Sequence, residues 1–214
     1  DMVHALSHDL GFNVVQLWHK DRDLQSVEAV VLPGGFSYGD YLRSGAIARF
    51  SPIMEEVVSF AHGGGRVMGV CNGFQILCEA GLLPGTLRHN ESRKFICRNV
   101  HLKPVSRTAS VSAGCDTDTP LVIPIAHGEG NYFIGDDGLK GLQDNDQILF
   151  QYCDENGAVN AMSNHNGALL NIAGICNEGK NVFGMMPHPE RRAETPLGGE
   201  DGRRLFDCAM EMLA

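Results

Sequence analysis

The sequence predicts an α/β protein of three layers, in which helices flank a mainly parallel central sheet that also carries antiparallel strands. Three observations support this class. Segments typical of strands and helices alternate over the first 80 residues, as in parallel sheets built with crossover helices. Short apolar runs separated by turn residues follow, and these predict antiparallel strands. A last amphipathic helix should pack back on the sheet.

An apolar stripe at helical spacing covers residues 3–10 and stops at Gly11, which predicts a first helix. Apolar runs at residues 14–18 and 29–32 have the length of short buried strands. The helix begins so close to Asp1 that no strand precedes it, although such a helix normally crosses over from a first parallel strand. We therefore expect the first strand to be missing from this chain, with a gap in the sheet beside residues 29–32. A chain extended upstream should be markedly more stable.

The second helix has a clear beginning and end. Ser51 suits its N-cap, Pro52 suits its first position, and the glycines at 63–65 should stop it. Residues 66–70 then form an apolar run typical of a strand, and an apolar helix should follow at about residues 72–80. This strand therefore runs into this helix with a single residue at the corner.

The second half of the chain contains shorter elements. Its predicted strands lie at residues 95–105, 122–126, 147–152, 170–175 and 182–186. The last helix should span about residues 201–213. Its apolar stripe consists of Leu205, Phe206, Ala209, Met210 and Leu213.

Composition restricts the class of protein. A length of 214 residues fits one domain, residues 1–214, with a sizeable core. Lys and Arg total 17 against 26 Asp and Glu, and the net charge of −9 disfavours binding to nucleic acid or an anionic membrane. The seven Cys include no C-x-x-C pair, which disfavours disulfides and a metal site and predicts a cytoplasmic chain. No apolar run suits a membrane helix, and the first residues do not suit a signal segment.

Residues 69–73 read Gly-Val-Cys-Asn-Gly and place Cys71 at the corner between the strand and the helix. This is the pattern of a nucleophile elbow, in which a tight turn holds the nucleophile in a strained conformation. Side chains at the flanking positions would collide with backbone, which explains the two glycines. The N-terminus of the helix also stabilises a thiolate. We interpret Cys71 as a nucleophile, whereas Cys78 and Cys208 are expected to be buried and inert.

Residues 187–190 read Pro-His-Pro-Glu and follow the last predicted strand. Pro189 favours an extended His188, and side chains two residues apart in an extended chain point to the same side. Glu190 can therefore hold one imidazole nitrogen while the other faces Cys71, as in a triad of nucleophile, base and orienting acid. A zinc deaminase uses the same His-x-Glu spacing, but the Pro-Cys-x-x-Cys motif that it also needs does not follow.

Two further loops follow predicted strands, where ligands of open α/β sheets bind. They are Pro-Gly-Gly-Phe-Ser at residues 33–37 and His-Gly-Glu-Gly at residues 127–130. The backbone N–H of Asn72 and an N–H of the first loop could stabilise a tetrahedral intermediate. Gln75 lies one helical turn above Cys71 and could hydrogen-bond a polar substrate. From the sequence alone, the first loop could also be an ordinary turn and the second a hairpin turn.

Residues 174–180 match a phosphate-binding loop except that Asn181 stands where Ser or Thr is required. The segment also leads into a predicted strand and not into a helix. We therefore interpret residues 177–181 as a turn and expect no ATP site in this chain.

Four longer motifs resemble the class I glutamine amidotransferases. Residues 33–43 read Pro-Gly-Gly-Phe-Ser-Tyr-Gly-Asp-Tyr-Leu-Arg, and residues 69–75 read Gly-Val-Cys-Asn-Gly-Phe-Gln. Residues 126–131 read Ala-His-Gly-Glu-Gly-Asn, and residues 186–191 read Met-Pro-His-Pro-Glu-Arg. In this wording they are similar to the small glutaminase subunits of phosphoribosylformylglycinamidine synthases, and they span most of the chain. The resemblance implies a flavodoxin-like fold.

The resemblance also implies roles for individual residues. It makes Cys71 the nucleophile, His188 the base and Glu190 its orienting partner, with oxyanion donors from Gly35 and Asn72. The glutamine-binding residues that it implies are Gly34, Gln75 and the backbone of Ala126, Gly128 and Glu129.

The implied function is the hydrolysis of glutamine to glutamate and ammonia for an ATP-dependent synthetase of purine biosynthesis. The implied partners are a large synthetase subunit and a small bridging subunit. This chain should need no cofactor, because ATP and Mg²⁺ are expected on the synthetase.

Two other functions remain open. The first is another cysteine hydrolase or a glyoxalase-like enzyme of the same broad fold, against which Gln75 and Glu190 argue. The second is a catalytically silent subunit that regulates a synthetase, against which the complete triad argues.

A run of basic residues in this acidic chain suits either a docking face for the synthetase or a solvated strand edge. The run consists of Arg88, Arg93, Lys94, Arg98, Lys103 and Arg107.

Overall fold

The strands of the computed structural model, which describes residues 1–40, 43–115 and 119–211, form a mixed sheet and a short ribbon. In sheet order, the seven strands found in this part of the chain are β1 (Ala29–Leu32), β2 (Arg66–Val70), β9 (Val182–Met185), β8 (Ile172–Cys176), β7 (Ile148–Cys153), β4 (Ile96–Pro104) and β5 (Leu121–His127). The ribbon pairs β3 (Thr86–Arg88) with β6 (Asn131–Phe133) in antiparallel orientation.

Five of these seven strands run in the same direction. β1, β2 and β9 are paired in parallel, β8 is antiparallel to β9, and β7 is antiparallel to β8. The same alternation continues through β4 to β5, so β7 and β5 run in the direction of β9. This confirms a mainly parallel sheet with added antiparallel strands, although only β1–β2 and β2–β9 are parallel neighbours. The carboxyl ends of five strands therefore meet at one edge of the sheet.

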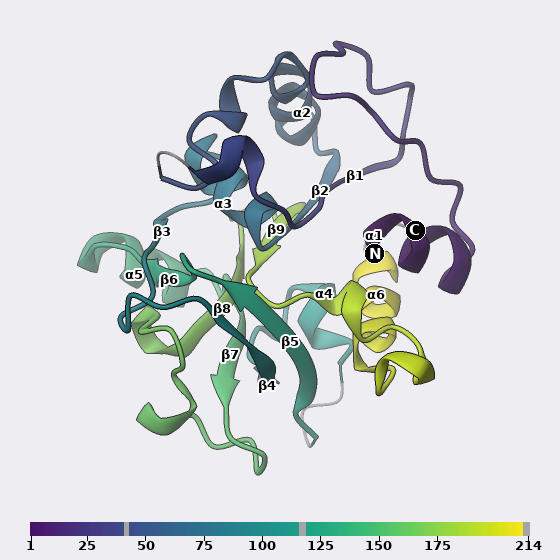
Figure 1. The fold of residues 1–214 in the computed structure, drawn as a ribbon. Coiled ribbons are helices and arrows are strands. Elements are labelled where there is room, and N and C mark those ends of the chain that lie inside the picture. Colours follow the sequence, from purple (N-terminus) through teal and green to yellow (C-terminus); the bar gives the residue numbers. More distant parts are fainter. Residues whose placement is uncertain (41–42, 116–118, 212–214) are drawn as a thin grey trace.

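Helices cover both faces of the sheet, which confirms the three-layer α/β architecture (Figure 1). Their bounds are α1 (Met2–His4), α2 (Pro52–His62), α3 (Asn72–Glu79), α4 (Ser110–Ala113), α5 (Asp136–Asp144) and α6 (Asp201–Glu211). α3 packs against β1, β2 and β9, whereas α4 and α6 pack against each other and against β7 and β5. No helix in the described part of the chain is long and apolar enough to cross a membrane.

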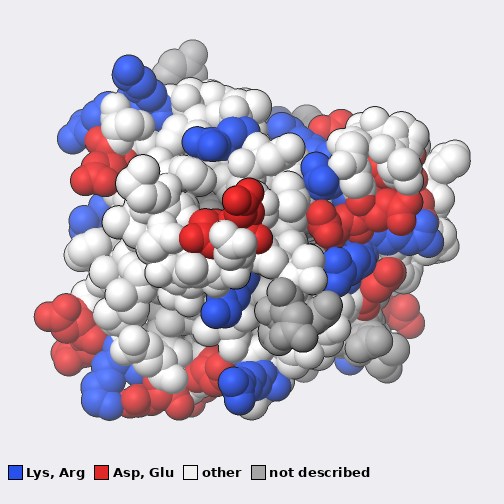
Figure 2. Space-filling view, turned by 90° about the horizontal axis from the view of Figure 1, so that it is seen from below, with Lys and Arg blue, Asp and Glu red and all other residues white. Residues whose placement is uncertain are grey.

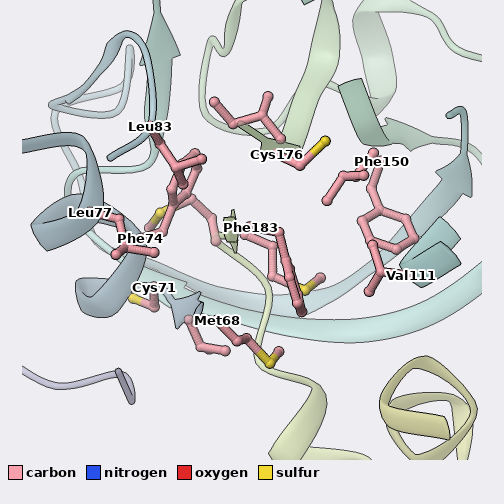
Figure 3. Close-up of a cluster of buried hydrophobic side chains, with 14 of the residues drawn as sticks. Met68, Cys71, Phe74, Leu77, Leu83, Val111, Phe150, Cys176 and Phe183 are labelled. Carbon is pink, nitrogen blue, oxygen red and sulfur yellow. The ribbon is translucent and has the colours of Figure 1, made fainter. Parts of the chain in front are cut away.

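The core reaches from the centre of the sheet to the elbow residue. Figure 3 shows Cys71 at the end of β2, beside Phe74 and Leu77 of α3. The side chains of Phe74 and Leu77 are fully buried. Because packing of this kind leaves little room for displacement, α3 holds Cys71 in a fixed place.

The predictions for the first residues are partly wrong. A helix begins at Met2, as predicted, and continues as a π-helical turn over Ala5–Asp9. Residues 14–18 are not a strand. The gap expected beside β1 is also wrong, because every pair of neighbouring strands in the described sheet is hydrogen-bonded. β1 lies at the edge, and no described strand pairs with its outer side. Residues 14–18 pair with none of the described strands, and an apolar run is a strand only where its backbone is hydrogen-bonded to a neighbour.

The other predicted elements are present, but the sequence does not predict α4, β3 or β6. Three further differences follow. α5 lies where the sequence predicts no helix. Two glycines in this segment, Gly138 and Gly141, lower its helix propensity, so the sequence does not indicate the helix. Ser51 occupies the N-cap of α2, but its side chain makes no capping hydrogen bond and its Oγ lies 3.4 Å from Nδ1 of His19. Cys208 is partly exposed, so the prediction that it is buried is wrong.

The remaining predicted segments have simple outcomes. The interpretation of residues 177–181 as a turn is confirmed, because β8 ends at Cys176 and β9 begins at Val182. Leu205, Phe206 and Ala209 form the buried stripe of α6. The side chains of Met210 and Leu213, predicted for the same stripe, lie outside the described residues.

Candidate active site

Cys71 lies at the corner between β2 and α3 with φ 50° and ψ −103°, a conformation that is strained for a residue with a side chain. Its N–H donates to the carbonyl of Met185 in β9 at 2.8 Å, which holds the corner in place. A Cβ on Gly69 would lie 2.7 Å from the carbonyl carbon of Gly73, and one on Gly73 would lie 2.0 Å from the carbonyl oxygen of Leu32. The flanking glycines are therefore required, and the predicted elbow is confirmed.

The thiol of Cys71 lies at the N-terminus of α3. It is buried and donates to the carbonyl of Ala126 in β5, with Sγ 3.9 Å from the oxygen. Asn72 is the first residue of α3, and an N–H at that position has no acceptor within its own helix. The unpaired N–H groups and the helix dipole favour a thiolate and an oxyanion at this point.

His188 and Glu190 form a buried pair just beyond β9. Nδ1 of His188 lies 2.6 Å from Oε1 of Glu190, and only 1% and 5% of the two residues is exposed. The N–H of His188 donates to the carbonyl of Pro124 at 2.8 Å, so β5 supports the loop that carries the base. Nε2 of His188 is buried and has no hydrogen-bond partner among the described residues. The carboxylate therefore orients the ring and leaves Nε2 to exchange protons with a substrate or nucleophile.

Gly34 lies close to both His188 and Cys71. A Cβ at Gly34 would lie 2.5 Å from Cε1 of His188 and 3.6 Å from Cβ of Cys71. The imidazole and the cysteine thus face the same point of the loop that follows β1. No side chain fits between this loop and the imidazole. At Gly35, by contrast, an added Cβ would meet no atom within 4 Å.

A chain of side-chain hydrogen bonds joins three of the loops around Cys71. The N–H of Ser37 donates to Oδ1 of Asn72 at 3.2 Å, and Nδ2 of Asn72 donates to Oε1 of Gln75 at 2.9 Å. Nε2 of Gln75 donates to the carbonyl of Glu129 at 2.7 Å. Gln75 therefore holds the loop after β5 against α3. Its contact with a substrate stays a prediction.

The loop after β5 depends on Asn90, which no motif in the sequence indicates. Asn90 is fully buried, and its Nδ2 donates to the carbonyls of Lys94 and His127 at 2.9 Å. Its Oδ1 accepts from the N–H of Gly130 at 3.0 Å, and its own N–H donates to the carbonyl of Gly128 at 2.8 Å. The only signal in the sequence is an Asn-Glu-Ser triplet, which resembles a glycosylation acceptor and gives no hint of these contacts.

Glu129 connects this loop to the opposite side of the site. Its Oε2 accepts from the N–H of Ser44 at 3.1 Å, and its Oε1 lies 3.3 Å from Nδ1 of His89. The predicted glutamine-binding residues Ala126, Gly128 and Glu129 thus lie on one segment at the end of β5. β1, β2, β9 and β5 run in the same direction, so the loops at their carboxyl ends lie at one edge of the sheet. The structure therefore brings this segment and Gly34 close to Cys71, His188 and Glu190.

His127 lies in the same segment, and its protonation should make the folded chain less stable at acidic pH. Burial, and secondarily His188, lower the pKa of His127 from 6.5 to about 4, and Nδ1 of His127 lies 3.0 Å from Oδ1 of Asn90. In the unfolded chain the imidazole of His127 binds a proton near pH 6.5, whereas in the folded chain it does so only near pH 4. The stabilisation from neutral His127 is complete above pH 6.5 and is lost as the pH falls to 4, by at most about 3 kcal/mol.

Urea unfolding at pH 7 and pH 5 should therefore show a larger loss of stability for the wild-type chain than for His127→Asn. Equal losses in the two proteins would exclude His127 as the source of the acid sensitivity.

Comparison with known proteins agrees with this geometry. The family described as the CobB/CobQ-like glutamine amidotransferase domain matches residues 1–197. The chain belongs to this family of glutamine amidotransferases.

Relatives of this amidotransferase are similar over nearly their whole length. The phosphoribosylformylglycinamidine synthase subunit PurQ of Chlorobium chlorochromatii is 52% identical over 213 residues, which cover 100% of this chain and 91% of that protein. The PurQ subunit of Pelagibacter ubique is 54% identical, over 96% of this chain and 90% of its own. The structure of PurLQS from Thermotoga maritima contains a chain with a TM-score of 0.82 and 38% identity, covering 100% of this chain and 94% of that chain.

One group of described side chains in this amidotransferase could hold a metal ion. That group consists of His4, His8 and Asp9, whose ligand atoms lie within 4.8 Å of one another. No triad residue belongs to it.

Replacing Glu190 by Gln tests the orienting role in the amidotransferase. The carboxamide can present an N–H to Nδ1 of His188 and so favour the wrong tautomer, and kcat for glutamine hydrolysis should fall by about 10³-fold or more. Initial rates of glutamate release measure this effect. Glu194→Gln, an acidic residue four positions further along, is the matched control and should keep its rate. Wild-type turnover in Glu190→Gln would remove Glu190 from the triad.

Proposed function

We propose that this chain is the glutaminase subunit of a phosphoribosylformylglycinamidine synthase, which supplies ammonia to an ATP-dependent synthetase in purine biosynthesis. The observation that carries the proposal is the buried pair of His188 and Glu190, which faces the strained elbow of Cys71 across Gly34. The full-length similarity to proteins named PurQ supports the choice of synthase.

The proposed reaction is acyl transfer. The thiolate of Cys71 attacks the carboxamide carbon of glutamine, and the N–H groups of Gly35 and Asn72 stabilise the resulting oxyanion. His188 gives a proton to the departing ammonia, and Glu190 stabilises the imidazolium. Water then hydrolyses the thioester with His188 as base, and glutamate leaves. In this proposal Gly34 and the backbone of Ala126, Gly128 and Glu129 line the glutamine site, and Gln75 completes it.

The proposal includes the other components of the synthase. A large synthetase subunit would use ATP and Mg²⁺, a small subunit would bridge the two, and this chain would work without a cofactor in the cytoplasm. The likeness to a chain in the structure of PurLQS from Thermotoga maritima supports a complex of this kind. The charge distribution gives no support to nucleic-acid binding, because Figure 2 shows acidic and basic side chains interspersed on the face that it presents.

The test is an assay of glutamate release from glutamine, run with the chain alone and with the synthetase present. Release that rises in the complex supports the proposal. Hydrolysis of other thioesters or amides in preference to glutamine would favour a different cysteine hydrolase of the same fold. An absence of turnover under both conditions would favour a silent regulatory subunit.

We also propose that the segment around Arg93 and Lys94 contacts the synthetase. Both side chains are exposed, and the segment is tied to the site because Asn90 bonds the carbonyl of Lys94. The neighbouring Phe95 is 55% exposed, and its ring centroid lies 6.3 Å from that of Phe36, which lies in the loop after β1. An exposed aromatic pair beside basic residues is typical of a protein interface.

Reversing both charges, with Arg93→Glu and Lys94→Glu, should weaken the complex by about tenfold and more strongly at low salt. Calorimetric titration against the synthetase measures this change. Reversal of two exposed charges elsewhere, Lys20→Glu with Arg203→Glu, is the control. An unchanged affinity of the first variant would favour a solvated strand edge.

A further inference from the structure

Two thiols outside the candidate active site approach each other closely. Cys115 follows α4 and is buried, and its thiol donates to Sγ of Cys208 in α6, with the sulfurs 3.2 Å apart. A Cβ on Gly114 would lie 3.4 Å from Sγ and 3.6 Å from Cβ of Cys208, so α4 and α6 are in direct contact here. The two residues are 93 positions apart in the sequence.

We propose that Cys115 and Cys208 are a reversible thiol–disulfide pair that links α4 to α6. A disulfide requires an S–S distance of about 2.05 Å, so the two sulfurs need to approach by only about 1.2 Å. Such pairs in reducing compartments are characteristically transient and sensitive to redox conditions.

The oxidant that we assign is a low-molecular-weight disulfide such as glutathione disulfide. Cys208 is the more exposed residue, and its thiolate attacks one sulfur of the glutathione disulfide, forming a mixed disulfide and releasing one glutathione. Cys115 then attacks Sγ of Cys208 and releases the second glutathione. Two protein thiols and one disulfide thus become one protein disulfide and two glutathione thiols. The hydrogen bond to Cys208 and burial raise the pKa of Cys115, which disfavours Cys115 as the thiol that makes the first attack.

The link would act on the helix that supports the triad loop. α6 packs on the 3₁₀ turn Pro189–Arg191, which contains Glu190. The N–H of Gly202 donates to the carbonyl of Arg192 at 2.8 Å, and a Cβ at Gly202 would lie 1.9 Å from the carbonyl oxygen of Pro189. Because a disulfide that closes a long loop restricts the unfolded chain, linking α6 should stabilise both the helix and this turn.

The experiment is an equilibration of the full chain with reduced and oxidised glutathione at graded ratios. Peptide mass spectrometry without reduction should find residue 115 joined to residue 208, and the number of titratable thiols should fall from seven to five at most. The melting temperature should rise by about 5 to 10 °C, and dithiothreitol should reverse the rise. Mapping the peptides separates this link from an adduct on Cys71.

Two variants complete the test. Cys208→Ser should form no link and show no rise in melting temperature, whereas Cys97→Ser, which removes an exposed thiol of β4, should keep both effects. Three results in the wild-type chain would overturn the proposal. They are a glutathione adduct that persists on Cys208 without a link, a dominant link between other residues, and a link that leaves the melting temperature unchanged or lowers it.

Discussion

Replacing Cys71 by Ala is expected to abolish glutamine-dependent synthesis by the assembled synthase and to leave synthesis from added ammonium salts intact. Only the step that produces ammonia uses the thiol, so the glutamine-dependent rate should fall by about 10³-fold or more. Product formation from each nitrogen source, measured on the same preparation, gives the comparison. Alanine meets the same backbone strain as cysteine at this corner, so the variant should fold like the wild-type chain.

Cys78 offers a matched control on the same helix. Its thiol is buried and donates to the carbonyl of Pro84, with 3.9 Å between sulfur and oxygen, and burial raises its pKa. Cys78→Ala should therefore retain glutamine-dependent synthesis. If Cys71→Ala lost both activities equally, the division of work between this chain and the synthetase would be wrong.

Replacing Gly34 by Ala is expected to have the second-largest effect. The added Cβ would lie 2.5 Å from Cε1 of His188, and the backbone and the buried ring cannot both stay in place. Because a small displacement of a base costs orders of magnitude in rate, kcat should fall by about 10²-fold or more. The rate of glutamate release measures the loss, and the circular dichroism spectrum shows whether the fold is kept.

Gly35→Ala is the comparison within the same loop. An alanine there keeps its N–H and meets no atom within 4 Å, so its kcat should fall by at most about tenfold. Equal losses in the two variants would show that the loop tolerates no side chain at all. The contact between Gly34 and His188 would then not explain the result.

The parts of the site that could be predicted from the sequence lie within short motifs at strand ends. Cys71 is recognisable because only glycine fits sterically at the flanking positions of the turn. Glu190 is recognisable because an extended backbone places it beside His188. These are local rules, and the structure confirms the geometry that they predict. The fold class was predictable for the same reason, since apolar periodicity determines most strands and helices one at a time.

The parts that could not be predicted depend on contacts between distant segments. Asn90 lies 37 positions from His127, and no sequence pattern around it predicts the hydrogen bond from its side chain to the carbonyl of His127. Residues 14–18 have the composition of a strand, but a strand forms only where a neighbouring ladder accepts it. That no described strand pairs with the outer side of β1 is a property of the whole sheet and not of the residues of β1.

The position of β9 determines when the enzyme can first become active during its synthesis. β9 (Val182–Met185) comes late in the chain but lies between β2 and β8, so the two parts of the sheet cannot join until it has left the ribosome. A nascent chain that ends before it carries Cys71 without His188 and Glu190. The part of the chain that is made before β9 thus lacks two of the three residues of the proposed triad, and β9 joins the two parts of the sheet directly before those two residues.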